Sequence, residues 1–201
     1  MSTLLKPLLI REELLKRNLH IFTVQEFNRL FQTPPLKTKY FLEQQAKHGL
    51  FSRLKKGLYA LKTDLPSEEE IANALYRPSY ISFEYALAYY GILPEMPHRV
   101  TSATTKPTRL FVTDSMSFAY YTIKISTYTG YSLVITAAKS FLIADREKAL
   151  IDYLYFESLG DKPHNDRLVL RNINKVKLLK YAKLFKRNGL TKLIKDIYAH
   201  S

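Results

Sequence analysis

The chain of 201 residues is long enough to bury the core of one large domain or of two small ones. Hydrophobic residues make up 46% of it, which excludes a disordered chain, and the lack of cysteine excludes disulfides, thiolate metal sites and thiol catalysis. The net charge of +13 favours a polyanionic partner, either nucleic acid or an anionic membrane, over a role in solubility alone.

The positive charge is concentrated at the two ends of the sequence. Residues 1–62 contain 12 Lys and Arg against 4 Asp and Glu, and residues 171–201 contain 9 against 1. Residues 63–170 carry 10 against 13 and are slightly acidic. Two basic flanks around such a middle indicate that the flanks share a polyanion. Because the sequence shows neither a signal peptide nor a long apolar run, we expect a soluble, cytoplasmic protein without a membrane partner.

Three short helices are predicted first, over 8–17, 24–31 and 33–48, because apolar residues recur near the helical period. Their ends are marked by Thr23 with Glu26 (a capping box), Thr33 as a cap with Pro34 in the first turn, and Gly49 as a stop. Two β-leaning runs, 50–54 and 58–61, then flank a turn that contains glycine, which is typical of a hairpin. Helix, tight break, helix and hairpin predict a winged helix-turn-helix domain over 1–62.

A second domain is predicted over 67–201, after a linker at 62–66. It opens with another capping box, Ser67 with Glu70, and Ser82 is expected to cap a helix over 83–90. Five strand-like runs follow, at 100–103, 109–113, 118–125, 133–136 and 141–143. Asp145 is expected to cap a helix to 157, and Asn174 a basic helix to 188 with Gly189 as its stop and a short helix after it. The fold class is therefore α+β: the winged helix-turn-helix, then a mixed α/β C-terminal domain that ends in basic helices.

The third helix has two chemically different faces. One face is expected to pack inward and consists of Thr38, Phe41, Leu42, Gln45 and Ala46. The opposite face carries Lys37, Tyr40, Gln44 and Lys47 at i, i+3, i+7 and i+10. A helix of this kind enters the major groove, where Lys reads guanine and Gln reads adenine. We expect Lys37, Tyr40 and Gln44 to contact bases, with Lys39 on phosphate and Lys47 on the same face.

Further cations lie beside the predicted hairpin turn and on the last basic helix. Arg53, Lys55 and Lys56 of the hairpin are expected to contact phosphate or the minor groove. The alternative is that these charges are simply solvated, on a small domain used for packing or protein contacts. A secondary polyanion contact is considered for the C-terminal helix, through Lys177, Lys180, Lys183, Lys186 and Arg187. DNA backbone, a membrane surface, an acidic partner and plain solvation all remain open for that helix.

Four stretches carry a resemblance to a known family: FTVQEF at 22–27, KHGLFSRLKKGLYAL at 47–61, RPSYISFEYALAYYG at 77–91 and ADREKALID at 144–152. In this order they are similar to the AbiE-type antitoxins of abortive-infection, phage-defence, type IV toxin–antitoxin operons. The resemblance implies a repressor that binds inverted repeats in its own double-stranded promoter DNA. It also implies that the protein counteracts a nucleotidyltransferase toxin without forming a stable complex, and it assigns DNA contact to Arg53, Lys55 and Lys56.

The sequence offers little for catalysis, and we expect no enzyme, no cofactor and no metal site. Its five histidines lack metal-ligand spacing, and no glycine-rich phosphate loop occurs. Asp145, Glu147 and Lys148 are reminiscent of a metal-dependent nuclease, but the adjacent Glu and Lys would diverge on a strand or a helix. We treat Asp145 as a helix cap and the rest as its first turn. The alternatives to an antitoxin are therefore a winged-helix regulator without a toxin and, less favoured, a nuclease with a DNA-targeting domain.

Overall fold

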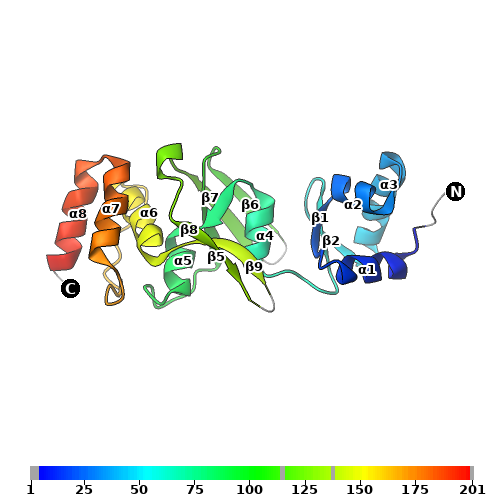
Figure 1. Cartoon of the computed structure of the whole chain (residues 1–201), viewed down its shortest axis with the longest axis horizontal. Coiled ribbons are helices and arrows are strands. Elements are labelled where there is room, and N and C mark those ends of the chain that lie inside the picture. The colour runs from blue at the N-terminus through cyan, green and yellow to red at the C-terminus, as the bar shows by residue number, and fades with distance from the viewer. Residues whose placement is uncertain (1–4, 114–115, 137–138, 200–201) are drawn as a thin grey trace. The chain divides into compact units, whose positions relative to one another are not determined.

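A computed structural model describes residues 5–113, 116–136 and 139–199, which form two compact units, Met1–Leu75 and Tyr76–Ser201. Over these described residues the fold is α+β, as predicted, with eight α-helices, a three-stranded antiparallel sheet and a six-stranded mixed sheet (Figure 1). The described helices include none that is both long and apolar enough to cross a membrane.

The first unit holds a small sheet in the strand order β1-β3-β2. Its elements are α1 (Pro7–Lys16), β1 (Ile21–Thr23), α2 (Val24–Phe31), α3 (Pro35–Lys47), β2 (Phe51–Lys55), β3 (Leu58–Leu61) and α4 (Glu68–Leu75). The three predicted helices and the hairpin of β2 and β3 are present within one or two residues. Helix α4, which the sequence analysis assigns to the second domain, falls within the first unit.

Local capping explains where α2 begins and how α3 is entered. The Thr23 hydroxyl accepts from the Glu26 backbone N–H at 3.2 Å, and the Glu26 carboxylate accepts from the Thr23 N–H at 2.7 Å. This confirms the predicted capping box. The predicted cap at Thr33 is wrong, because Pro34 occupies the N-cap position without a side-chain cap. The Thr33 hydroxyl is instead buried against the Thr38 hydroxyl at 2.6 Å, which ties the inter-helix turn to α3.

Aromatic rings fill the core of the first unit. Phe22 of β1 lies 5.7 Å from Phe27 of α2 and 5.3 Å from Phe51 of β2, between ring centroids. Phe41 of α3 lies 5.9 Å from Phe27, so one cluster joins α2, α3 and the sheet. Leu42 is fully buried beside them. The predicted inward face of α3 is confirmed at Thr38, Phe41 and Leu42, while Gln45 and Ala46 are half-buried.

The second unit is built on a six-stranded sheet with the order β6-β7-β5-β4-β9-β8. Its strands are β4 (Ser79–Ile81), β5 (Arg99–Thr104), β6 (Arg109–Val112), β7 (Ser117–Thr122), β8 (Tyr131–Ile135) and β9 (Ser140–Ala144). β5 pairs with β7 in parallel, and so does β4 with β9, while the other neighbours are antiparallel. The five predicted strands are present. Strand β4, which has three residues and lies in the middle of the sheet, was not predicted.

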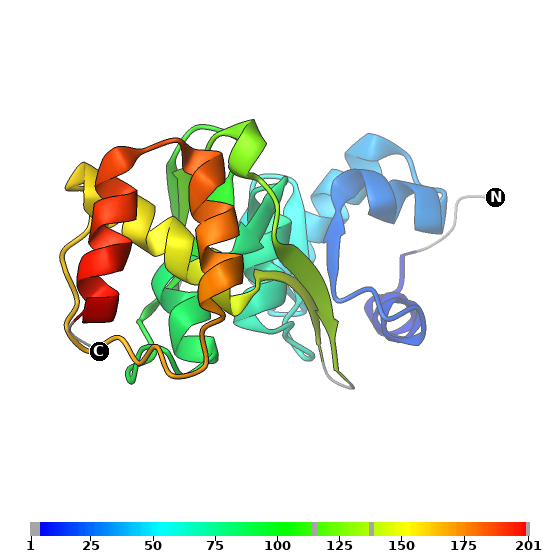
Figure 2. The same cartoon turned by 60° about the vertical axis from the view of Figure 1, so that its left-hand side comes forward.

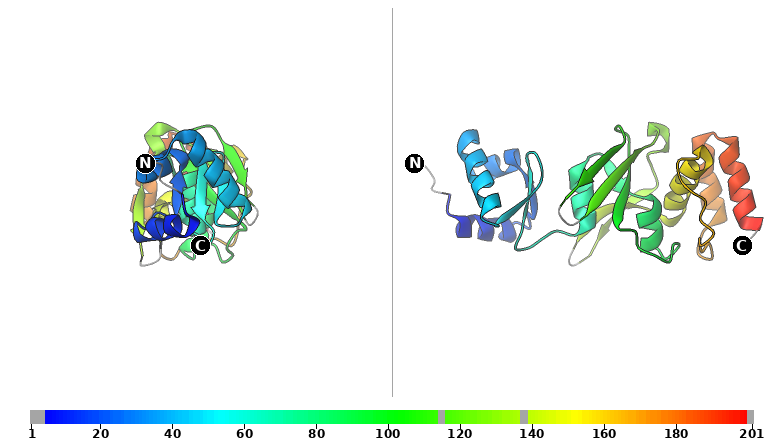
Figure 3. Two further views of the ribbon diagram at one scale, coloured as in Figure 1. Left: turned by 90° about the vertical axis from the view of Figure 1, so that its right-hand side faces the viewer. Right: turned by 180° about the vertical axis from the view of Figure 1, so that it is seen from behind.

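Helices cover this sheet in two successive layers. They are α5 (Phe83–Tyr89), α6 (Arg146–Leu159), α7 (Lys175–Phe185) and α8 (Asn188–Ala199), with a 3-10 turn at Ile125–Thr127. Helix α6 contacts α5 and β9 and also α7 and α8. Figures 1 and 2 show α7 and α8 side by side beyond α6, as the outer layer of this unit, and Figure 3 shows the same layers from behind. The predicted stop at Gly189 is wrong: α7 ends at Phe185, Lys186 adopts a left-handed conformation, and Gly189 lies within α8.

A buried ion pair joins the sheet to its helices. Lys148 and Asp152, one turn apart on α6, are both fully buried, and Lys148 Nζ contacts Asp152 Oδ1. Asp152 Oδ2 accepts from the Ser82 hydroxyl at 2.8 Å and from the Tyr80 hydroxyl at 3.1 Å. Burial raises the pKa of Asp152, and Lys148, Ser82 and Tyr80 oppose that shift. The expectation that Ser82 caps α5 is wrong, because its side chain makes no cap hydrogen bond and serves Asp152 instead.

The first turn of α6 is bound to the start of α7. Asp145 Oδ1 accepts from the Lys148 backbone N–H at 2.8 Å, which confirms the predicted cap, and its Oδ2 accepts from the Tyr181 hydroxyl at 2.7 Å. Lys177 Nζ lies 3.0 Å from Asp145 Oδ2 and 3.1 Å from Glu147 Oε2. Asn174 caps α7 as predicted, through its side chain and the Lys177 backbone N–H. These two acidic groups at the start of α6 therefore hold α7 in place.

Replacing Lys148 by alanine is expected to lower the free energy of unfolding by about 3–5 kcal/mol, because it leaves the Asp152 carboxylate buried without its cation. The double variant Lys148→Met, Asp152→Asn removes both charges, keeps an amide oxygen to accept from Ser82 and Tyr80, and should recover most of this loss. Urea unfolding of the single and double variants measures both values. A loss below about 1 kcal/mol in the single variant would contradict a structural role for the pair.

Candidate nucleic-acid interface

The solvent-facing side of α3 begins at an apolar residue. Leu36 is 84% exposed and Tyr40 is 67% exposed, and Lys47 is exposed near the end of the same helix. Lys37 and Gln44, predicted at the centre of this face, are half-buried on its flank. The predicted face is therefore present but rotated, and its centre runs through Leu36, Tyr40 and Lys47.

Leu36 was not among the residues predicted for this face. A leucine in a helix is ordinarily assigned to the buried face. The other apolar residues of this helix already account for its buried face without Leu36. The signal that would have found it is spacing, since Leu36 and Tyr40 are four residues apart and share a face. An exposed leucine beside an exposed tyrosine suits apolar contact with a thymine methyl group.

The other flank of α3 is next to the hairpin. Lys39 is exposed on this flank, whereas the half-buried Glu43, three residues after Tyr40 and four before Lys47, lies within their row. Burial raises the pKa of Tyr59 on β3, with Glu43 adding to the shift and Arg53 of β2 opposing it. Helix α3 also packs against β2, so the second half of α3 lies beside the base of the hairpin.

The three hairpin cations do not share one environment. Arg53 and Lys56 are exposed, and Gly57 completes the turn with a φ of +80°, a conformation that glycine adopts without strain. Lys55 is half-buried, and its Nζ donates to the backbone carbonyl of Leu75. The strand register shifts between Arg53 and Lys55, which separates the directions of their side chains. Arg53 and Lys56 are therefore the accessible cations of the hairpin.

The predicted cations of the C-terminal helix divide in a similar way. Lys180, Lys183 and Lys186 are exposed. Lys177 bridges Asp145 and Glu147 and is a structural residue of the second unit. Arg187 donates to the hydroxyl and the carbonyl of Ser158, at 2.9 and 2.7 Å.

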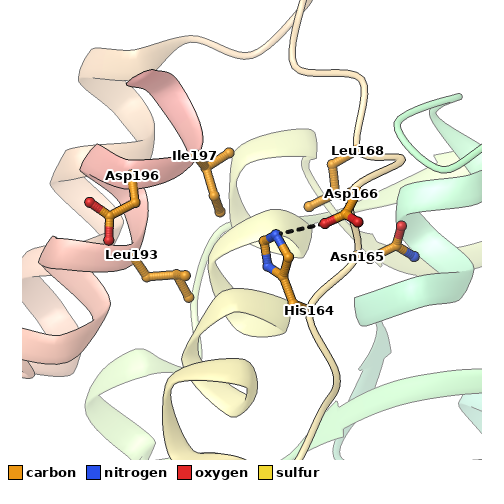
Figure 4. Close-up of a pocket in the computed structure, with 7 residues that line it drawn as sticks. All are labelled: His164, Asn165, Asp166, Leu168, Leu193, Asp196 and Ile197. Atoms are coloured by element: carbon orange, nitrogen blue, oxygen red, sulfur yellow. Dashed lines mark ion pairs between the residues drawn. The ribbon is translucent and has the colours of Figure 1, made fainter. Parts of the chain in front are cut away.

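A cavity of about 460 Å³ lies in the second unit, between α8 and the segment that precedes α7. Its lining residues are His164, Asn165, Asp166, Leu168, Leu193, Asp196 and Ile197 (Figure 4). The Nδ1 atom of His164 lies 2.5 Å from Glu157 Oε1, and Nε2 lies 3.0 Å from Asp166 Oδ1. Among the described lining residues there are an imidazole and carboxylates but no hydroxyl or thiol nucleophile.

Across the described residues, no three His, Cys, Asp or Glu side chains gather as metal ligands would. No protein-family model matches the chain, and no curated protein is significantly similar to it in sequence. The chemistry of the exposed side chains on α3, the hairpin and the outer helices is therefore the basis for a functional assignment.

His164 is expected to titrate above its ordinary pKa of 6.5, because the hydrogen bond with Glu157 favours the charged imidazolium. The stability that this contact contributes is complete below pH 6.5 and is lost as the pH rises through the folded-state pKa. NMR titration of the imidazole measures the midpoint, and Glu157→Gln should lower it. An unchanged midpoint in that variant would exclude Glu157 as the cause.

Proposed function

We propose that this protein binds double-stranded DNA through residues 1–62 and represses transcription. In this proposal α2, the turn and α3 form a helix-turn-helix, the β2–β3 hairpin is its wing, and α3 is the recognition helix. The observation that carries the proposal is the exposed face of α3, with Leu36, Tyr40 and Lys47 in a row and Lys39 on its flank.

The groove chemistry fits this face. The major groove of B-DNA admits one α-helix, and the first half of a recognition helix usually contacts the bases. Leu36, Lys37, Tyr40 and Gln44 lie in that half or just beyond it, and Lys37 and Gln44 remain proposed as readers of guanine and adenine. Lys39, Lys47, Arg53 and Lys56 surround them as phosphate contacts, which position a protein without reading sequence. Lys55 was predicted as another such contact, but its bond to the Leu75 carbonyl makes it a weaker candidate.

We further propose that the protein is an antitoxin of a type IV toxin–antitoxin pair. The support is the resemblance of the four stretches at 22–27, 47–61, 77–91 and 144–152 to AbiE-type antitoxins. The proposed ligand is then promoter DNA with inverted repeats, and the proposed functional partner is a nucleotidyltransferase toxin. Co-expression with the neighbouring gene distinguishes this role from a regulator without a toxin, since only an antitoxin rescues growth.

A metal-dependent nuclease is the less favoured function. The residues that it would need near α6 already have structural partners: Asp145 caps the helix, and Glu147 and Asp145 bind Lys177. Lys148 is fully buried against Asp152 and cannot reach a substrate phosphate. Metal-dependent cleavage of a duplex by the purified protein would overturn this assignment.

The protein is expected to bind duplex DNA from upstream of its own gene more tightly than a scrambled duplex of the same composition. Specific sites are typically preferred by about 10³-fold or more over non-specific DNA. Fluorescence anisotropy at several salt concentrations measures both affinities and their salt slopes. Equal, weak binding to both duplexes would contradict a specific repressor.

Substituting the outward face of α3 should reduce this preference. Leu36→Ala or Gln44→Ala is expected to cost about 1–3 kcal/mol on the upstream duplex and little on the scrambled one, because base contacts carry the specificity. Leu8→Ala is the matched control, since Leu8 is a leucine on α1 that is 74% exposed. If Leu36→Ala and Leu8→Ala behave alike, Leu36 is not at the interface.

A further inference from the structure

We propose that the edge strand β8 is a dimerisation site, at which it pairs antiparallel with β8 of a second copy of this chain. The six-stranded sheets of the two copies then join across a two-fold axis into one continuous sheet. The site consists of residues 131–135 of the second unit. The inference goes beyond the proposed DNA binding and does not rest on it.

The outer side of β8 presents backbone groups that β9 does not use. Strand β8 ends the order of described strands, so β9 is its one strand neighbour among them. In an antiparallel pair, residues bonded to the partner strand alternate with residues whose N–H and C=O point away from it. The Thr136 N–H donates to the Lys139 carbonyl at 2.8 Å, which fixes the alternation. Tyr131, Leu133 and Ile135 therefore direct their N–H and C=O groups away from β9.

The side chains of the same three residues form an apolar row. They lie on one face of β8, because successive side chains of a strand point to opposite faces. Leu133 is 54% exposed and Ile135 is 71% exposed, while the half-buried Tyr131 stacks on the Tyr80 ring with 4.5 Å between centroids. Figure 2 shows the β8–β9 hairpin reaching beyond the helices of this unit. The edge thus combines outward backbone groups with exposed apolar side chains.

The two edges of the sheet differ in their protection. Exposed edge strands usually carry a charged side chain, a proline or a bulge, any of which opposes pairing with another chain. The opposite edge, β6, begins at Arg109, and Lys106 and Pro107 lie just before it. Strand β8 contains neither a charge nor a proline, and its register with β9 is unbroken over residues 131–135. Pairing with another strand is therefore opposed at β6 but not at β8.

The charge pattern favours a second copy of this chain as the partner. Residues 125–138 contain no Asp, Glu, Lys or Arg, and they form the longest such run in a chain of net charge +13. Two copies can meet along this run without bringing their like charges together, which would be costly elsewhere on so basic a protein. A partner strand of opposite charge would find no charge here to recognise.

The strand is also complementary to itself. A two-fold axis at Leu133, the middle residue of β8, places it opposite Leu133 of the second copy and places Tyr131 opposite Ile135 of the second copy. The outward N–H and C=O groups of each residue then face those of the residue opposite, so both are paired. Tyrosine opposite isoleucine is an aromatic and β-branched pair, which stabilises paired strands. The pairing therefore satisfies the backbone and covers the apolar row together.

The first test is the mass of the full-length protein in solution, measured by sedimentation equilibrium at several protein concentrations. The wild type should reach the mass of two chains. Leu133→Lys should reduce it to one chain, because like charges directly opposite each other destabilise paired strands. Leu110→Lys is the matched control, since Leu110 is a leucine of the opposite edge that is 51% exposed, and this variant should remain a dimer.

Two outcomes of this experiment overturn the proposal. One is a wild type that keeps the mass of one chain at every concentration. The other is a mass that grows beyond two chains, because a head-to-tail contact between β6 and β8 does not close on itself.

Mixing two charge variants tests the position of the axis and excludes misfolding as the cause of dissociation. Leu133→Glu alone should also have the mass of one chain. An equimolar mixture of Leu133→Lys and Leu133→Glu should recover the two-chain species, because opposite charges then face each other on the axis. Misfolded variants would not recover on mixing. A mixture that stays monomeric beside a dimeric wild type would overturn the pairing at Leu133.

The lack of cysteine in the chain allows a covalent measurement of the same contact. Leu133→Cys should form a disulfide-linked dimer with a mild oxidant, since Cα atoms of a hydrogen-bonded antiparallel pair lie about 5.5 Å apart, within the range of a disulfide. Leu110→Cys should stay largely unlinked under the same conditions. Equal linking of the two variants would contradict a specific contact at β8.

These measurements use the protein without DNA, so their outcome is separate from that of the DNA-binding experiments. A two-fold dimer supplies two recognition helices, as many as the proposed inverted repeats require. A monomeric protein that still prefers the upstream duplex would overturn the dimer and leave the proposed function intact.

Discussion

The buried pair of Lys148 and Asp152 is the constraint around which the second unit is organised. Removing two charges from water costs several kcal/mol for each ion, so such a pair is tolerated only when its remaining hydrogen-bonding groups are satisfied. Tyr80 and Ser82 meet this need from the chain segment of β4, and the Phe185 ring of α7 lies 5.1 Å from Lys148 Nζ. The pair therefore fixes a central strand, α6 and α7 in one arrangement.

The neighbouring cations show how the fold handles a large excess of positive charge. Lys162 is bound to Glu84 and lies 4.4 Å from the centroid of the Tyr121 ring, and Lys177 bridges two carboxylates of α6. These lysines stabilise the unit and are not available to a partner. Net charge alone thus overestimates the number of cations that a partner can contact. That number depends on which cations the tertiary structure leaves exposed to solvent.

Features governed by neighbours in sequence were predictable. The caps at Thr23, Asp145 and Asn174 each depend on an acceptor and an N–H three residues away, so the sequence contains both partners. The same holds for the turn at Gly57. Ser82 occupies a cap position by the same rule, but a carboxylate seventy residues away competes for its hydroxyl. A local sequence pattern therefore fails to predict a cap where a buried carboxylate competes for the same hydroxyl.

The helical spacing of the candidate DNA-binding face was predicted, but the position of its centre around the axis of α3 was not. The helical repeat determines that Lys37, Tyr40, Gln44 and Lys47 lie on one side of α3, whereas the rings packed around Phe41 determine which part of that side faces solvent. Leu36 became part of the exposed face only through that packing, and the aromatic cluster of the first unit is built from residues distant in sequence.

By itself, the sequence determined the fold class, the helices, the caps at Thr23, Asp145 and Asn174, the hairpin and the basic character of both ends, because these follow from composition and from contacts within a few residues. Only the tertiary structure decided that β4 enters the middle of the sheet, that Lys148 and Lys177 are structural, and that the lysines of α7 and α8 stay exposed. The physical reason is that burial and ion pairing depend on groups that only folding brings together.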